Sequence, residues 1–405
     1  MDRVNVGLSA THIRLETELH RLYANVAAQP VTGLCGLFSG QIGYALFECY
    51  YQRQFGLTDN CRIWDRLEVS IDAIATGSVD HAFAGGMAGI AWGYLHLSNH
   101  GFLADSADDP QDVVAALDEP LFLLSMDDLR AGQFDYLHGG LGVCLYFLER
   151  PRSATIESYL TQLVAQLETL SIRQDDGSIT WRFHGFDAGA ASQPVTYNPS
   201  LSHGTASIVA VLCLLHRHGY AQRSCARLID GGLRWLWNVR NKNHPAVFPK
   251  LLVEGQPRDE FCRMAWCYGD PGIAHTFRLA GETLGNPRWT QIADYTMRKA
   301  ASRRSRPESL VSDLGFCHGS AGLAHLFSKF ARWYPHPVFA ETARFWSEVT
   351  LTHSLPAVAD DGSPKTALLS HRGSFDLLEG EASTGLVLLA QLGADTAWER
   401  AFLLQ

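Results

Sequence analysis

The chain has 405 residues, of which 46% are hydrophobic and 19% charged, and its formal net charge is −9. This composition is typical of a water-soluble protein with a large core. An acidic chain without clusters of Lys or Arg argues against a nucleic acid or an anionic membrane as its partner. The first twenty residues lack the apolar segment of a secretory signal, and the most apolar stretch, 82–97, is too short to insert across a bilayer. Nine cysteines at irregular spacings favour a reduced, cytoplasmic protein over a disulfide framework.

One twelve-residue block occurs seven times along the chain. The blocks occupy 37–48, 83–94, 136–147, 201–212, 266–277, 316–327 and 377–388. Their fourth position is always glycine: Gly40, Gly86, Gly139, Gly204, Gly269, Gly319 and Gly380. The seventh position is glycine in five blocks and serine in two, at Ser207 and Ser383. Repetition at intervals of 46 to 65 residues indicates one structural unit per block.

Each block runs into an apolar stretch of helical length, which predicts an inner helix. Glycines three apart lie on one helix face and let neighbouring backbones approach closely. Amphipathic segments between the blocks predict outer helices; 157–171, for example, places Leu160, Leu163 and Leu167 on one side. Seven helix pairs that stack into a closed ring need no end caps. We therefore predict an all-α fold, an α/α toroid of about fourteen helices that forms a single domain over residues 1–405.

Two regions interrupt the helical pattern. Residues 176–199 and 239–260 are rich in Gly, Pro and residues that favour strands. They predict extended loops or short hairpins near the mouth of the central cavity, where a peptide could enter.

Three side chains with metal-binding chemistry stand at equivalent block positions. Cys267 occupies the second position of the fifth block, and Cys317 and His318 occupy the second and third positions of the sixth. These positions precede the inner helices, at the rim of the central cavity, so neighbouring repeats should bring the side chains together. Two thiolates and one imidazole are three ligands of a tetrahedral zinc site, with a fourth position left for water or a substrate thiolate. A structural zinc, another thiophilic divalent metal, or a buried trio without metal are the alternatives.

The repeat motifs resemble those of the lanthionine synthetase C-like (LanC) family. WCYGDPG, CHGSAG and LSHG appear in the family's order, and the resemblance covers essentially the whole chain. It implies an α/α-barrel enzyme that closes thioether rings in dehydrated precursor peptides. It also implies that Cys267, Cys317 and His318 hold Zn²⁺. The block that contains LSHG departs from the family's usual GLAHG pattern, and Ser207 and Ser383 replace repeat glycines.

The resemblance also supplies catalytic candidates. His203, in LSHG, matches the family's histidine for proton transfer, and Asp135, just before the third block, matches its active-site aspartate. Arg263 and Tyr268 fall on further active-site positions. The implied reaction adds a peptide cysteine thiol to dehydroalanine or dehydrobutyrine and forms lanthionine or methyllanthionine. His203 would then protonate the α-carbon of the enolate, while Asp135 supports its imidazole. Arg263 would offset the enolate charge.

Each catalytic candidate also has a structural interpretation. His203 could be a hydrogen-bonded helix-terminal histidine, Asp135 a helix cap, Arg263 a surface ion pair and Tyr268 a packing residue. His138 and Glu379 occupy the same rim position in their blocks without a role implied by the resemblance. His275 and His325 lie further down their helices, and we expect them to pack or to support the site. We expect Cys144 and Cys213 to lie in the core.

The expected partner is a dehydrated precursor peptide, with leader and core, supplied by a separate dehydratase. Neither nucleic acid nor membrane insertion is expected. One alternative keeps the metal chemistry but adds glutathione to dehydroamino acids in proteins. Another is a zinc-stabilised scaffold that binds peptides without turnover. An α/α-barrel glycosidase is disfavoured because the rim positions carry thiols and imidazoles in place of paired carboxylates.

Overall fold

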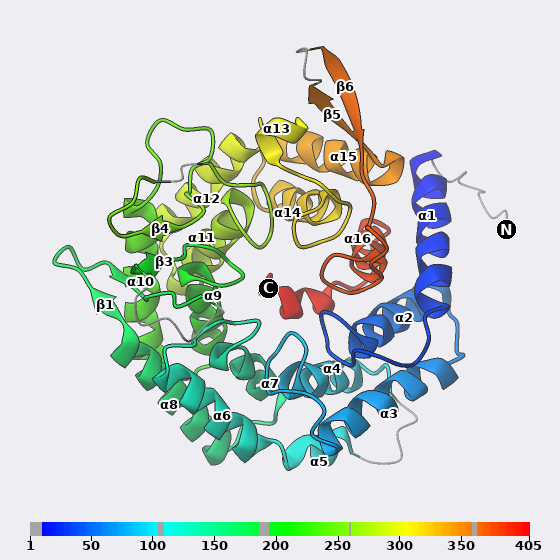
Figure 1. Cartoon of the computed structure of the whole chain (residues 1–405), viewed down its shortest axis with the longest axis horizontal. Helices are drawn as coiled ribbons and strands as arrows, with labels where there is room; N and C mark the ends of the chain where they lie inside the picture. The colour runs from blue at the N-terminus through cyan, green and yellow to red at the C-terminus, as the bar shows by residue number, and fades with distance from the viewer. Residues whose placement is uncertain (1–9, 104–108, 186–193, 259–260, 359–362) are drawn as a thin grey trace, which may run out of the picture.

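A computed structural model describes residues 10–103, 109–185, 194–258, 261–358 and 363–405 (Figure 1). The fold is an α/α toroid, as predicted, with an inner and an outer ring of helices. The inner ring comprises α2 (Gln41–Phe55), α4 (Met87–Asn99), α7 (Val143–Glu149), α9 (Thr205–Arg217), α11 (Asp270–Leu284), α14 (Ser320–Trp333) and α16 (Glu381–Gln391). The outer ring comprises α1 (Ala10–Ala27), α3 (Cys61–Ala75), α6 (Asp118–Arg130), α8 (Ala154–Leu170), α10 (Gln222–Asn238), α12 (Pro287–Ala300) and α15 (Pro337–Thr352).

Burial along the sequence explains why the two rings separate. Helix α9 is buried on every side from Thr205 to Leu215, as its nearly continuous apolar sequence requires. Outer helices bury one face only; α8 buries Leu160, Leu163 and Leu167, the residues predicted to face inward. Helix α16 contacts both α1 and α2, which closes the ring. Across the described residues, no helix combines the length and apolar character needed to cross a bilayer.

The block glycines serve mainly the turn within their own block. A Cβ at Gly269 would lie 2.0 Å from the carbonyl oxygen of Arg263, and one at Gly272 would lie 2.1 Å from that of Trp266. Gly269 also has φ +89°, a left-handed conformation that glycine adopts without steric cost. The predicted reason, close approach of neighbouring helices, is therefore only part of the explanation. The glycines first let each loop fold over the start of its helix.

The C-terminal segment lies near the centre of the ring (Figure 1). The 3₁₀ helix η2 (Ala397–Phe402) packs against aromatic residues at the first position of the blocks: the ring centroid of Phe402 lies 5.4 Å from that of Trp266 and 4.1 Å from that of Phe316. The hydroxyl of Tyr136 donates to the carbonyl of Ala401, and the indole N–H of Trp266 donates to the carbonyl of Phe402 at 2.8 Å. The C-terminal segment thus fills part of the cavity that the repeat predicts. We call the end where the inner helices begin the open end, because a pocket lined by Cys267 and His318 lies there.

Short two-stranded sheets account for the interruptions of the helical pattern. Just before the first region, β1 (Ile172–Arg173) pairs with β2 (Ile179–Thr180), which lies inside it. The two predicted extended regions then meet, because β3 (Thr196–Tyr197) pairs antiparallel with β4 (Leu252–Val253). Residues 186–193 and 259–260 of those regions lie outside the described residues. A third two-stranded sheet, β5 (Ser354–Val358) with β6 (Pro364–Leu368), was not anticipated. Short helices α5 (Pro110–Ala115) and α13 (Arg306–Ser309) and the 3₁₀ turn η1 (Gly140–Gly142) complete the described elements.

Backbone hydrogen bonds join the second positions of neighbouring blocks into a ring. Each such N–H donates to the carbonyl of the next block: Phe38 to Ala84, Ala84 to Leu137, Ser202 to Cys267, Cys267 to Cys317, Cys317 to Leu378, and Leu378 to Phe38. At the remaining junction the N–H of Leu137 donates instead to the carboxylate of Asp135, at 2.8 Å. This ring is the physical reason that equivalent residues of adjacent repeats lie side by side.

Candidate active site

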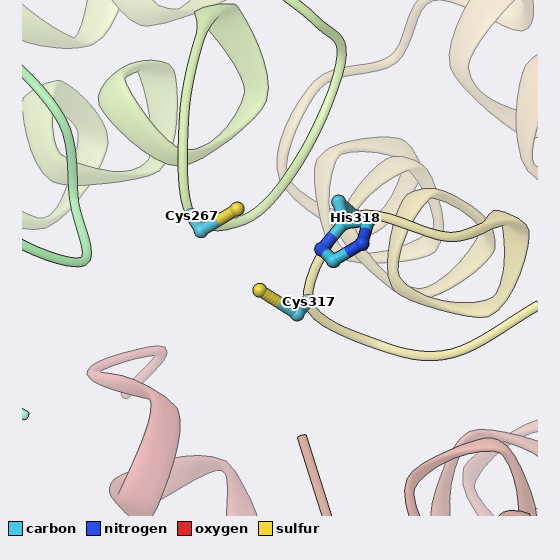
Figure 2. Close-up of side chains that lie close together, drawn as sticks. All are labelled: Cys267, Cys317 and His318. Carbon is cyan, nitrogen blue, oxygen red and sulfur yellow. The ribbon is translucent and has the colours of Figure 1, made fainter. Parts of the chain in front are cut away.

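The three predicted metal ligands converge at the open end of the toroid. The N–H of Cys267 donates to the carbonyl of Cys317 at 3.3 Å, which places the two cysteines next to each other. The two sulfurs and a ring nitrogen of His318 all lie within 4.8 Å of one another, and Figure 2 shows them facing a common point. Both cysteines are buried and His318 is half-buried. One ion could reach all three atoms, and the donor set of two thiolates and one imidazole suits zinc.

A carboxylate orients the imidazole of this group. Nε2 of His318 lies 3.1 Å from Oδ2 of Asp313, so Nδ1 is the nitrogen directed to a metal. Metal-binding histidines commonly hold their second nitrogen against a carboxylate in this way. Glu379 approaches from the seventh block, with Oε1 3.6 Å from Nδ1 of His318. Sequence reasoning missed Asp313, although an acidic residue three positions before a block is a visible signal.

The three side chains of the trio shift one another's pKa values. The hydrogen bond from Cys317 lowers the pKa of Cys267 to about 5, although burial opposes this. The same interaction raises the pKa of Cys317, which retains the shared proton. Burial works against charge on His318, but Asp313 and the sulfur of Cys267 raise its pKa to about 10. A metal ion would replace these protons as the positive charge between the sulfurs.

His203 and Asp135 form a second pair, one repeat away from Cys267. Nδ1 of His203 lies 2.6 Å from Oδ2 of Asp135, and the backbone N–H of Ser202 donates to the carbonyl of Cys267. Asp135 also accepts the backbone N–H groups of Leu137 and His138. Asp135 therefore stabilises the turn that precedes the third inner helix and contacts His203. It is not the cap of that helix, because the N-cap position of η1, which leads into the helix, is Gly139 and no side chain caps it.

Tyr268 connects the two groups. Its ring centroid lies 5.8 Å from that of His203, and its hydroxyl accepts a hydrogen bond from Asn198 at 3.2 Å. Burial raises the pKa of Tyr268, so the phenol stays protonated at neutral pH. On the other side of His203, the ring of His138 stacks nearly parallel at 6.0 Å.

A pocket of about 440 Å³ opens onto two of the candidate metal ligands. It is lined by Cys267 and His318 together with Lys250, Phe261, Cys262, Arg263, Tyr268 and Leu310. Arg263 therefore lies on the wall of this pocket, next to Cys267 and His318; its catalytic role stays a prediction. Burial raises the pKa of Cys262 to about 12, so this neighbouring thiol is protonated at neutral pH.

A buried ion pair holds the loops that form this pocket. Nη1 of Arg303 lies 3.3 Å from Oδ2 of Asp270, and both residues are almost fully buried. Asp270 also accepts the backbone N–H groups of Val247, at 3.0 Å, and Phe248, at 2.9 Å. Burial raises the pKa of Asp270, and Arg303 opposes that rise. Sequence reasoning missed both residues because they lie in different segments without a shared pattern.

The remaining candidates lie outside the site. His325 is buried beside η2, where its Nε2 lies 2.7 Å from Oε1 of Glu399. His275 is buried against Trp333. Both therefore contribute to packing, as expected, and so do Cys144 and Cys213, whose side chains are inaccessible. All nine cysteines are free thiols.

The model of the lanthionine synthetase C-like protein family matches residues 33–403. The chain belongs to the lanthionine synthetase C-like family. The match extends from just before the first block to the end of η2, so the family assignment covers all seven repeats and the site between them.

Two known proteins resemble this lanthionine synthetase C-like protein. The nisin biosynthesis protein NisC of Lactococcus lactis subsp. lactis is 23% identical over 303 residues, which make up 68% of this chain and 69% of that protein. A solved structure of a nisin cyclase is 19% identical and superposes with a TM-score of 0.72. This second match covers 97% of each chain. At this identity the structural likeness shows that the toroidal fold is shared.

Proposed function

We propose that the protein is a zinc-dependent cyclase that forms thioether rings in a dehydrated precursor peptide. The observation that carries this proposal is the convergence of Cys267, Cys317 and His318 on one point beside an open pocket. The resemblance to a nisin cyclase, a protein named for this activity, supports it. A separate dehydratase would supply the substrate, and the free thiols suit a reducing cytoplasm.

The proposed reaction joins a cysteine sulfur of the peptide to the β-carbon of dehydroalanine or dehydrobutyrine. The S–H bond breaks, a C–S bond forms, the double-bond electrons move to the α-carbon, and one proton is then added there. The mass of the peptide does not change. Zinc held by Cys267, Cys317 and His318 would supply a positive centre that lowers the pKa of the incoming thiol. A free cysteine has a pKa of about 8.5, so little thiolate exists otherwise.

The chain's own residues would handle the charge and the proton. Arg263 and Lys250 line the pocket, where their positive charges would stabilise the enolate oxygen. Asp135 holds Nδ1 of His203, so Nε2 is the atom that would donate a proton to the α-carbon. Tyr268, beside His203, would orient the substrate carbonyl with its hydroxyl.

The decisive experiment is incubation with a dehydrated precursor peptide, with and without a chelator. Alkylation of free thiols followed by mass analysis then counts the closed rings, because ring closure removes thiols without a mass change. We expect alkylation to disappear with the zinc-loaded protein and to persist with chelator. A reaction that leaves every thiol alkylatable refutes the cyclase. An adduct with added glutathione, in the absence of rings, supports the glutathione-transfer alternative instead.

A further inference from the structure

Leu310 is an exposed apolar residue on the wall of the metal pocket. Its side chain is 43% exposed, and its backbone has φ +55°, in the left-handed region that residues with a Cβ rarely adopt. Glycine or asparagine would occupy this conformation at lower cost. An exposed leucine in a strained conformation therefore carries two unfavourable features at once, and such outliers concentrate at ligand-binding sites.

The wall that carries Leu310 is held rigidly by the interior. Leu310 ends the short helix α13, whose residue Ser309 accepts the backbone N–H of Met264 at 2.8 Å. Arg303 donates to the carbonyl of Glu308 at 3.0 Å and to the carbonyl of Cys262. One buried guanidinium thus ties the Leu310 turn to the segment that leads into the metal ligand Cys267.

Phe261 forms the other apolar part of this wall. Its ring lies over the guanidinium of Arg303 at 5.5 Å and meets the ring of His244 edge-on at 5.8 Å. The same arginine therefore contacts Phe261 directly and Leu310 through its helix. We name Phe261 and Leu310 together the apolar wall; the polar residues Lys250, Arg263 and Tyr268 line the same pocket.

We propose that the apolar wall is a subsite for an apolar side chain of the peptide, on a residue adjacent to the dehydroamino acid that reacts. This inference rests on the proposed function and extends it to the class of sequence that is cyclised. A peptide whose carbonyl groups face Lys250 and Arg263 would direct a neighbouring side chain to Phe261 and Leu310. Contact with that side chain removes the exposed leucine surface from water and so favours apolar over polar neighbours.

Binding of unreactive peptides tests the subsite separately from catalysis. The probes are two short synthetic peptides with one cysteine and an alanine in place of dehydroalanine, which differ only in having Leu or Ser beside the alanine. We expect zinc-loaded wild-type protein to bind the Leu peptide about tenfold more tightly, measured by titration calorimetry. The variant Leu310→Gly relieves the backbone strain but removes the side chain. In this variant the affinities of the Leu and Ser peptides should differ by no more than about twofold.

Two control variants complete the test. Leu310→Met keeps an apolar side chain and should keep the preference, and Leu123→Ala removes an exposed leucine (51% exposed) from helix α6 and should leave it unchanged. The subsite is overturned if the ratio of the two peptides' dissociation constants is the same in wild type and in Leu310→Gly. It is also overturned if the wild type binds neither peptide. The matching peptides with dehydroalanine are assayed for ring closure in parallel. Selective binding without ring closure would retain the subsite and reject the proposed cyclase.

Discussion

Asp135 and His203 form a 2.6 Å contact across the junction between the third and fourth repeats. At this junction the carboxylate of Asp135 accepts the N–H of Leu137, where at the other described junctions the carbonyl of the next block accepts the equivalent N–H. At Leu378 the carboxylate of Asp376 accepts the N–H as well, alongside the carbonyl of Phe38. The carboxylate is therefore held by its own block through one oxygen and presents the other to the next block. A fixed Asp135 in turn fixes the orientation of the His203 ring.

We predict that His203→Asn lowers kcat for ring closure by roughly 10²- to 10⁴-fold, because the variant lacks the proposed proton donor to the α-carbon. Zinc content and peptide affinity should stay at wild-type levels, since His203 is not a member of the metal-binding group. Asp135→Asn should lower kcat as well, in the same assay of free thiols. Normal turnover by His203→Asn would show that another group supplies the proton.

We predict that Cys267→Ala and Cys317→Ala each abolish tight zinc binding, because two donor atoms do not make a stable site. Metal analysis of the purified protein should find about one zinc per chain in the wild type and little in either variant. Cys61→Ala, which removes an exposed cysteine, is the matched control and should retain its zinc. Equal zinc in all three variants would contradict the assignment of the ligands.

We predict that Asp313→Asn weakens zinc binding by roughly 10- to 100-fold while the fold is retained. The carboxylate that orients His318 is lost, but the side chain can still accept the backbone N–H of Gly315. Asp80→Asn is the control, because Asp80 precedes its block by the same three positions and accepts a backbone N–H without touching a metal ligand. Competition with a chromogenic chelator measures both affinities. If Asp313→Asn and Asp80→Asn lost the same zinc affinity, the cause would be a disturbed loop and not the loss of the contact with His318.

We predict that Arg303→Met destabilises the protein by about 3–5 kcal/mol, because Asp270 would remain as a buried, unpaired carboxylate. Arg298→Met should cost less than about 1 kcal/mol, since Arg298 pairs with Asp294 in an exposed position. Urea unfolding followed by tryptophan fluorescence compares the two. Similar unfolding midpoints would mean that the buried pair contributes no more than a surface pair.

We predict that acid loosens the C-terminal segment through Glu399. Burial raises its pKa, but His325 and Lys329 outweigh this and lower it from 4.5 to about 2. Its contribution to stability is therefore complete above pH 4.5 and is lost as the pH falls toward 2, an effect of the order of a few kcal/mol. Glu399→Gln should be less stable at pH 7 and lose less stability between pH 5 and pH 2. Parallel stability curves for both proteins would refute this role.

The repeat in the sequence determined the toroid and the metal-binding group. A block that recurs seven times must place equivalent residues at equivalent points of a closed ring, so Cys267 and Cys317 in adjacent blocks had to become neighbours. The same register placed His203 and Tyr268 at the open end. The local sequence pattern was sufficient to predict where these four residues lie, because each has a fixed position in its own block.

Only the tertiary structure revealed the contacts between segments that share no register. Arg303 follows an outer helix, yet it meets Asp270 at the start of an inner one and fixes the loops around the pocket. Glu399, in the last nine residues, reaches His325 inside the ring. Such pairs depend on the three-dimensional path of loops and termini, and a buried charge selects its partner by proximity and desolvation, which no periodicity in the sequence encodes.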